Sequence, residues 1–118
     1  EATPGAVGLE TLLPALMSLH HQDGLPIIDL LRAVTAAPAQ LMGLEGGKLA
    51  KGAVADLVLF DPSAPLLIDA TKLLSRSKNS PFDGRRLQGG VIRTVVAGRT
   101  VYSARGSRRW ARHLGETL

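Results

Sequence analysis

Two adjacent histidines and an aspartate form the first group of residues that could do chemistry. His20, His21 and Asp23 carry side chains of the types that bind divalent metals such as zinc. The residues before them have helical spacing, and neighbouring side chains on a helix point about 100° apart. The two histidines therefore do not chelate one ion from one face, as a pair four residues apart would. We expect a solvated helix end here and no metal site.

The dipeptide Pro4-Gly5 is the second candidate, because a glycine in a turn lets the backbone approach a ligand closely. A proline–glycine pair is also typical of an ordinary turn, and spacing alone favours that interpretation. The chain contains no cysteine, which excludes disulfides and thiolate metal sites and is compatible with a cytoplasmic protein.

Three short helices are predicted in the first part of the chain. Residues 9–20 carry apolar side chains at helical spacing, with Thr11 as N-cap and Pro14 in the first turn. Residues 26–35 and 36–44 each have an apolar stripe and a proline near the start. Such short helices with tight joins do not make an independent bundle. We interpret them as the last helices of a larger α/β body.

Residues 46–62 connect these helices to a β part, and the rest of the chain is organised around them. A glycine-rich turn leads through Ala55-Asp56 into Leu57–Phe60, four consecutive apolar residues. This pattern predicts a short strand that is buried on both faces. Asp61-Pro62 is expected to end the strand, because proline cannot donate to a sheet hydrogen bond.

Short strands and a hairpin are predicted after this segment. Residues 66–68 form a short strand, and residues 71–78 form a turn of helix or a loop. Residues 77–90 read as a long loop that contains glycine and proline. Residues 91–96 and 99–102 are the arms of a hairpin joined by Ala97-Gly98. So few strands leave sheet edges unpaired, so we expect them to complete a sheet begun elsewhere.

Length and composition indicate a globular segment. The 118 residues are 45% apolar and 3% aromatic. No apolar run reaches the roughly 18–20 residues that span a bilayer, so no membrane association is expected. The N-terminal residues lack the pattern of a signal peptide and an initiator methionine. We therefore expect the chain to begin inside a larger protein.

Charge is unevenly distributed along the chain. Residues 72–118 hold eleven of the fourteen basic residues and two of the ten acidic residues. A basic half can contact nucleic acid or membranes. Without interleaved aromatic residues or a nucleic-acid motif, we favour a solvated surface that complements acidic neighbours. Residues 104–118 form a basic tail in which Trp110 and Leu114 could dock as a short helix, although a partly ordered terminus is favoured.

Four stretches together resemble one enzyme family. The run in 46–62 is similar to the point where cyclic-amide hydrolases of the amidohydrolase superfamily leave their barrel. Residues 4–14, 31–44 and 77–84 resemble, in order and spacing, motifs of bacterial-type (class I) dihydroorotases. The four stretches cover approximately residues 4–102. The chain thus resembles the C-terminal third of a dihydroorotase.

This resemblance implies a fold, a reaction and a cofactor. The fold class would be α/β: residues 1–45 would be the last helices of a (β/α)8 TIM-type barrel. Residues 46–103 would be part of a small accessory β-sandwich domain, and residues 104–118 the basic C-terminal tail. The family interconverts N-carbamoyl-L-aspartate and L-dihydroorotate in pyrimidine biosynthesis, using zinc bound by histidines and a carboxylate.

The metal ligands of the family belong upstream of Glu1, so this chain alone is expected to be inactive. His20, His21 and His113 match no metal position of the family. The one position carried over is Pro4-Gly5, which aligns with a Phe-Gly pair whose backbone contacts the substrate. Proline removes one N–H donor, whereas the carbonyls and the Gly5 N–H stay available for a small-molecule substrate.

Other functions remain open at this point. The chain could belong to an inactive dihydroorotase-like assembly partner of aspartate carbamoyltransferase, or to a hydantoinase or allantoinase. The dihydroorotase interpretation predicts three partners: the N-terminal portion of the same enzyme, further copies in a homo-oligomer, and aspartate carbamoyltransferase. No nucleic-acid partner is expected.

Overall fold

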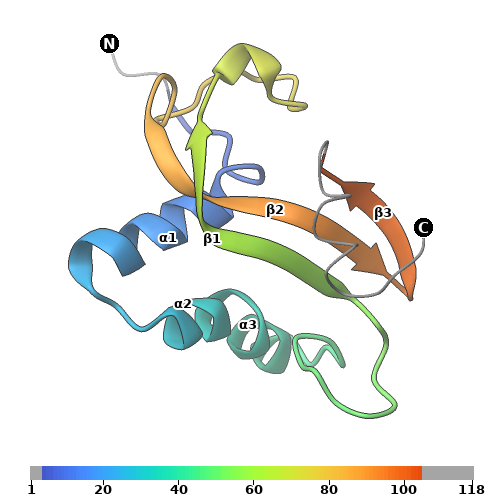
Figure 1. Cartoon of the computed structure of the whole chain (residues 1–118). Coiled ribbons are helices and arrows are strands. Elements are labelled where there is room, and N and C mark those ends of the chain that lie inside the picture. Colours follow the sequence, from blue (N-terminus) through green and yellow to red (C-terminus); the bar gives the residue numbers. More distant parts are fainter. Residues whose placement is uncertain (1–3, 105–118) are drawn as a thin grey trace. The chain divides into compact units, whose positions relative to one another are not determined.

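The structure, a computed structural model, describes residues 4–104. Helices come first and strands follow, which confirms the predicted α/β class. The elements in Figure 1 are α1 (Leu12–Asp23), α2 (Ile27–Val34), α3 (Ala36–Leu41), β1 (Leu57–Leu67), the 3-10 helix η1 (Ala70–Lys72), β2 (Arg86–Val96) and β3 (Arg99–Ser103). The chain divides into two compact units, residues 1–30 with 62–90 and residues 31–61 with 91–118.

Helix α1 belongs to the first unit and follows Thr11, as predicted. Pro14 lies in the first turn, where its missing N–H is not needed. Thr11 is buried, but its hydroxyl donates to the Gly8 carbonyl at 3.4 Å and makes no side-chain cap of the helix. The helix ends at Gly24, whose φ of 69° is left-handed.

The apolar core of the first unit gathers where α1 meets β2. Met17 of α1 is fully buried, and Ile68, Ala70 and Leu87 are also buried. Gly89 of β2 lies so close to α1 that a Cβ added there would be 2.8 Å from Met17 Cγ. A glycine is therefore required at the contact between this helix and this strand.

The sheet has the order β1-β2-β3, and β2 pairs antiparallel with β3. Val96 faces Arg99 across the two-residue link Ala97-Gly98, which confirms the predicted hairpin. Both link residues have positive φ, 48° and 76°, as a type I′ hairpin turn requires. The pairing shifts between Thr94 and Val95, so β3 contains a bulge there.

Strand β1 corrects two predictions. It continues through Asp61-Pro62 to Leu67 and takes up the start of the predicted strand 66–68. In the sheet of the described residues β1 is an edge strand, which needs ladder hydrogen bonds on one side only, and proline is tolerated at such a position. Leu57, Val58 and Leu59 are exposed in this chain, whereas the sequence predicted a strand buried on both faces.

Strand β2 corrects a third prediction. It begins at Arg86, so residues 86–90 belong to a strand and only 77–85 remain of the predicted loop. Residues 86–89 alternate exposed and buried, which is the pattern of a strand with one covered face. Residues 71–78 were predicted to form a turn of helix or a loop. They contain the end of η1, and residues 73–78 lie in a loop.

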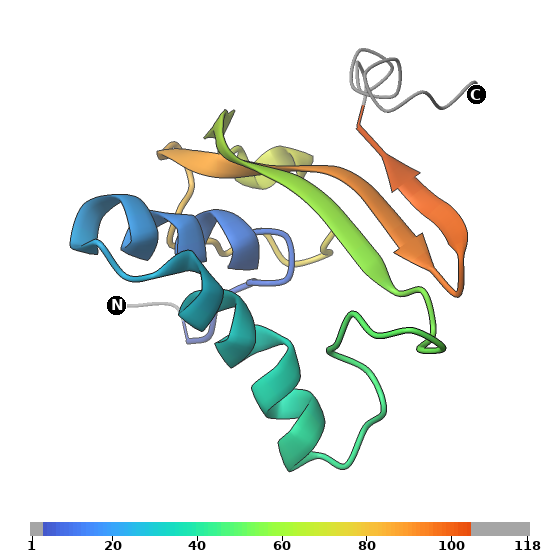
Figure 2. The same cartoon turned by 60° about the horizontal axis from the view of Figure 1, so that its bottom comes forward.

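In the second unit, α3 leads into a long loop, residues 42–56, which turns back to β1 (Figure 2). Ala39 of α3 is buried, and Gly47 packs against the backbone of Thr35 just before the helix. Within residues 4–104 no helix is long and apolar enough to cross a membrane. Most of the predicted basic tail, with His113, lies outside the described residues.

Candidate functional site

The first part of the candidate site is the N-terminal loop that contains Pro4 and Gly5. Both residues are exposed, and the loop runs to the start of α1. Gly5 has a φ of 76°, and no atom lies within 4 Å of the position of an added Cβ. The backbone conformation, not lack of space, therefore requires glycine at this position.

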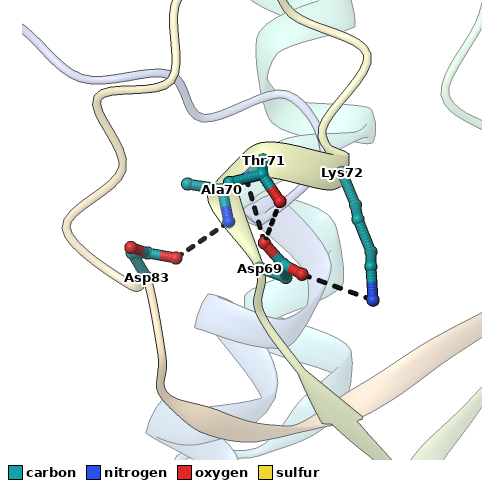
Figure 3. A network of polar contacts seen from close by, with 5 residues as sticks. All are labelled: Asp69, Ala70, Thr71, Lys72 and Asp83. Carbon is teal, nitrogen blue, oxygen red and sulfur yellow. Dashed lines mark hydrogen bonds and ion pairs between the residues drawn. The ribbon is translucent and has the colours of Figure 1, made fainter.

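The second part is the loop between η1 and β2, which is closed at its base. The Ile68 N–H donates to the Arg85 carbonyl at 3.0 Å, and the Gly84 N–H donates to the Ile68 carbonyl at 2.9 Å. Asp83 Oδ1 accepts from the Ala70 N–H at 2.8 Å (Figure 3). These bonds tie both ends of the loop to the ends of β1 and β2.

Asp69 organises η1 at the same base (Figure 3). Its Oδ1 accepts from the Thr71 N–H at 3.0 Å and from the Thr71 hydroxyl at 2.5 Å. Its Oδ2 lies 3.3 Å from Lys72 Nζ. The hydrogen bond from the Thr71 hydroxyl, supported by Lys72, holds the pKa of the Asp69 carboxyl below its ordinary value.

This lowered pKa predicts an acid-dependent contribution to stability. Because the folded protein favours the charged carboxylate, the contribution is present at neutral pH and is lost as the pH falls through the lowered pKa. Asp69→Asn should therefore make the thermal midpoint less sensitive to acid. Midpoints measured from neutral to acidic pH test this, with Glu45→Gln at an exposed carboxylate as control. An unchanged pH dependence in Asp69→Asn would contradict it.

The two loops are joined directly to each other. The Asn79 side-chain amide donates to the Gly5 carbonyl, and the Val7 N–H donates to the Asn79 carbonyl at 2.9 Å. The Leu74 N–H donates to Glu10 Oε2 at 2.8 Å. The Gly5 carbonyl thus accepts one hydrogen bond from Asn79, and its second lone pair stays available for a further donor.

Asn79 and Glu10 also belong to the candidate site, although the sequence analysis did not single out either residue. Both residues lie inside motifs that resemble dihydroorotases, and this was the only sign in the sequence that they could belong to a site. Sequence spacing gives no sign of the pairing, because 74 residues separate Gly5 from Asn79. The structure places them together in one unit of the chain.

The histidines at the end of α1 make separate contacts. His20 Nδ1 donates to the Leu25 carbonyl at 2.7 Å, and His21 Nε2 donates to the Pro62 carbonyl at 2.9 Å. Among the described residues no group of three histidine, cysteine, aspartate or glutamate side chains could hold a metal ion. Residues 4–104 therefore contain no complete three-ligand metal site of their own.

A hollow of about 430 Å³ is lined by residues 45–48, residues 50–54 and Asp56 of the second unit. Asp56 Oδ1 accepts from the Ala97 N–H at 2.8 Å, and the Ala55 carbonyl accepts from the Gly98 N–H at 3.0 Å. The Ala55-Asp56 pair thus holds the β2–β3 turn. Its role is structural in this chain.

Asp56→Ala should destabilise that hairpin turn by about 1 kcal/mol, the typical net value of one hydrogen bond. Asp56→Asn keeps a side-chain oxygen that can accept from Ala97 and is the matched control. Thermal unfolding of the two variants measures the difference. If both lose the same stability, the carboxylate charge, rather than the bond to the turn, is what matters.

Comparison with known proteins shows the family to which this chain belongs. Residues 16–102 match the Amidohydrolase family, and the chain belongs to that family. The chain is similar to the dihydroorotase of Anaplasma phagocytophilum, with 53% identity over 100 residues that cover 85% of this chain and 22% of the relative. The dihydroorotase of Pelobacter propionicus is 45% identical over 101 residues, 86% of this chain and 24% of the relative. The predicted resemblance to dihydroorotases is confirmed.

Solved structures agree with this class. The L-hydantoinase (dihydropyrimidinase) from Arthrobacter aurescens superposes with a TM-score of 0.78 at 35% identity, over 86% of this chain and 23% of that protein. A D-hydantoinase gives a TM-score of 0.76 at 24% identity, over 86% and 22%, which shows a shared fold. The chain spans less than a quarter of the length of these relatives.

Proposed function

We propose that this chain is the C-terminal segment of a zinc-dependent dihydroorotase, which interconverts N-carbamoyl-L-aspartate and L-dihydroorotate in pyrimidine biosynthesis. The observation that carries the proposal is the 53% identity to a dihydroorotase over 85% of the chain. In this proposal residues 1–45 are the last barrel helices. Residues 46–103 belong to the accessory β domain, and the enzyme is cytoplasmic.

Exposed apolar surface supports a larger body around this chain. Among the described residues, eighteen large apolar side chains are exposed, whereas six apolar side chains are buried. Leu9, Leu41 and Leu74 are almost fully exposed. Soluble proteins rarely leave so much apolar surface uncovered, so we propose that the N-terminal portion of the same enzyme covers it.

The joined loops give this segment its role in the proposed enzyme. The Gly5 N–H and the Pro4 carbonyl are the backbone groups through which we propose contact with the substrate. The Gly5 carbonyl already accepts from Asn79, so one lone pair is left on it for the substrate. Zinc would polarise the substrate amide and activate water. We propose that its ligands come from the N-terminal portion, since residues 4–104 hold no group of three potential metal ligands.

A hydantoinase is the second candidate, because the L-hydantoinase superposes well at 35% identity. A substrate panel separates the two. The protein, purified from its own host through a C-terminal tag, is assayed with dihydroorotate, hydantoin and allantoin, and its zinc content is measured. The proposal predicts zinc and a preference for dihydroorotate. A preference for hydantoin or allantoin would contradict it, as would a zinc-free protein that co-purifies with aspartate carbamoyltransferase.

A further inference from the structure

We propose that Asn79 is a positioning residue that holds the Pro4-Gly5 backbone in its substrate-binding conformation. The inference rests on the proposed function, because it assigns Asn79 a role toward the substrate contact of that function. Asn79 would not touch the substrate or the reacting atoms. It would act through Gly5.

The geometry around Ala6 carries the proposal. Asn79 binds the residues on both sides of Ala6: its side-chain amide donates to the Gly5 carbonyl, and its carbonyl accepts from the Val7 N–H at 2.9 Å. One residue thereby fixes both the orientation of the Gly5 peptide and the path of the chain after it. Gly5 needs such support, because glycine adopts positive and negative φ about equally well. Its residue type alone therefore does not fix the φ of 76°.

Asn79 is itself held in place by the fold. The loop that carries it is closed by the bonds from Ile68 to Arg85, from Gly84 to Ile68 and from Ala70 to Asp83. A second tie between the two loops, from the Leu74 N–H to Glu10 Oε2 at 2.8 Å, fixes the far end of the N-terminal loop. The position of Gly5 is thus set by the ends of β1 and β2 through Asn79.

The chemistry of the side chain makes the proposal testable. Aspartate has nearly the same shape as asparagine but has no N–H donor when ionised. Asn79→Asp would place a carboxylate oxygen against the Gly5 carbonyl, whereas the backbone bond to Val7 would remain. The substitution therefore removes the tie to Gly5 with little change in volume.

The test compares Asn79→Asp with the wild-type full-length protein, using Ser77→Ala in the same loop as control. We expect KM for dihydroorotate to rise on the order of tenfold, since one hydrogen bond is lost, whereas kcat and zinc content change less than about twofold. Asn79→Gln keeps the donor and should recover part of the loss. An unchanged KM would overturn the proposal, and so would an equal fall in kcat and zinc content, which indicates general damage.

A readout without activity separates this inference from the proposed function. Hydrogen exchange at residues 5–8 should be faster in Asn79→Asp than in wild type and unchanged in Ser77→Ala. If exchange accelerates but the wild-type enzyme does not turn over dihydroorotate, the proposed function fails and the role of Asn79 in holding the loop stands. If exchange does not change, the positioning role is wrong whatever the substrate.

Discussion

Gly47→Ala should lower the free energy of unfolding by about 3 kcal/mol, since a positive φ and an overpacked contact each cost about 1–3 kcal/mol. Gly47 has a φ of 76°, and an added Cβ would lie 2.7 Å from the Thr35 carbonyl oxygen and 2.9 Å from its carbon. These are backbone atoms at the start of α3, so the clash cannot be relieved by a rotamer change. The added Cβ would also lie 3.0 Å from Ala39 Cβ, so it would be crowded by a side chain as well.

The neighbouring glycine is the matched control for this prediction. Gly46 has no atom within 4 Å of an added Cβ, so Gly46→Ala should leave stability nearly unchanged. Thermal unfolding of the full-length protein measures both variants. Equal midpoints would show that the 42–56 loop does not pack on Thr35 as the structure has it.

Gly89→Ala should cost about 2–3 kcal/mol through the contact between α1 and β2. The added Cβ would lie 2.8 Å from Met17 Cγ and 3.4 Å from the Pro14 Cα. Met17 is fully buried, so its side chain cannot move out of the way into solvent without leaving the core. The φ of 113° at Gly89 adds backbone strain.

Two further variants separate the clash from the strain. Gly84 also has a positive φ, 72°, but an added Cβ meets no atom within 4 Å, so Gly84→Ala should cost about 1 kcal/mol. Shortening Met17 to alanine opens space, so the loss in the double variant with Gly89→Ala should be smaller than the sum of the single losses. Strictly additive losses would contradict the contact between Met17 and Gly89.

Local patterns were enough to predict the helices and the hairpin. The apolar spacing of α1, Pro14 in its first turn and the positive φ at Gly98 are decided by near neighbours in the chain. The length of β1 was not predictable in this way. Inside a strand proline is compatible mainly with an edge position, and the position of β1 in the sheet is a tertiary property.

The candidate site likewise has a part that local sequence could predict and a part that depends on contacts between distant segments. Pro4-Gly5 could be singled out from the sequence because it stands in a motif that resembles a family. The contact between Gly5 and Asn79 could not, because it joins segments 74 residues apart. Ala55-Asp56 shows the reverse case: it stands in a family motif, yet its contacts hold the Ala97-Gly98 turn.

The central claim, that this chain is one segment of a larger dihydroorotase, is tested most directly by intact mass. The protein is isolated from its own host through a C-terminal tag and weighed under native and denaturing conditions, and the same sample is assayed with dihydroorotate. We predict that the tagged sequence is part of, or remains bound to, a much larger chain and that this material turns over dihydroorotate. A folded, monodisperse species of 12.4 kDa would contradict the account.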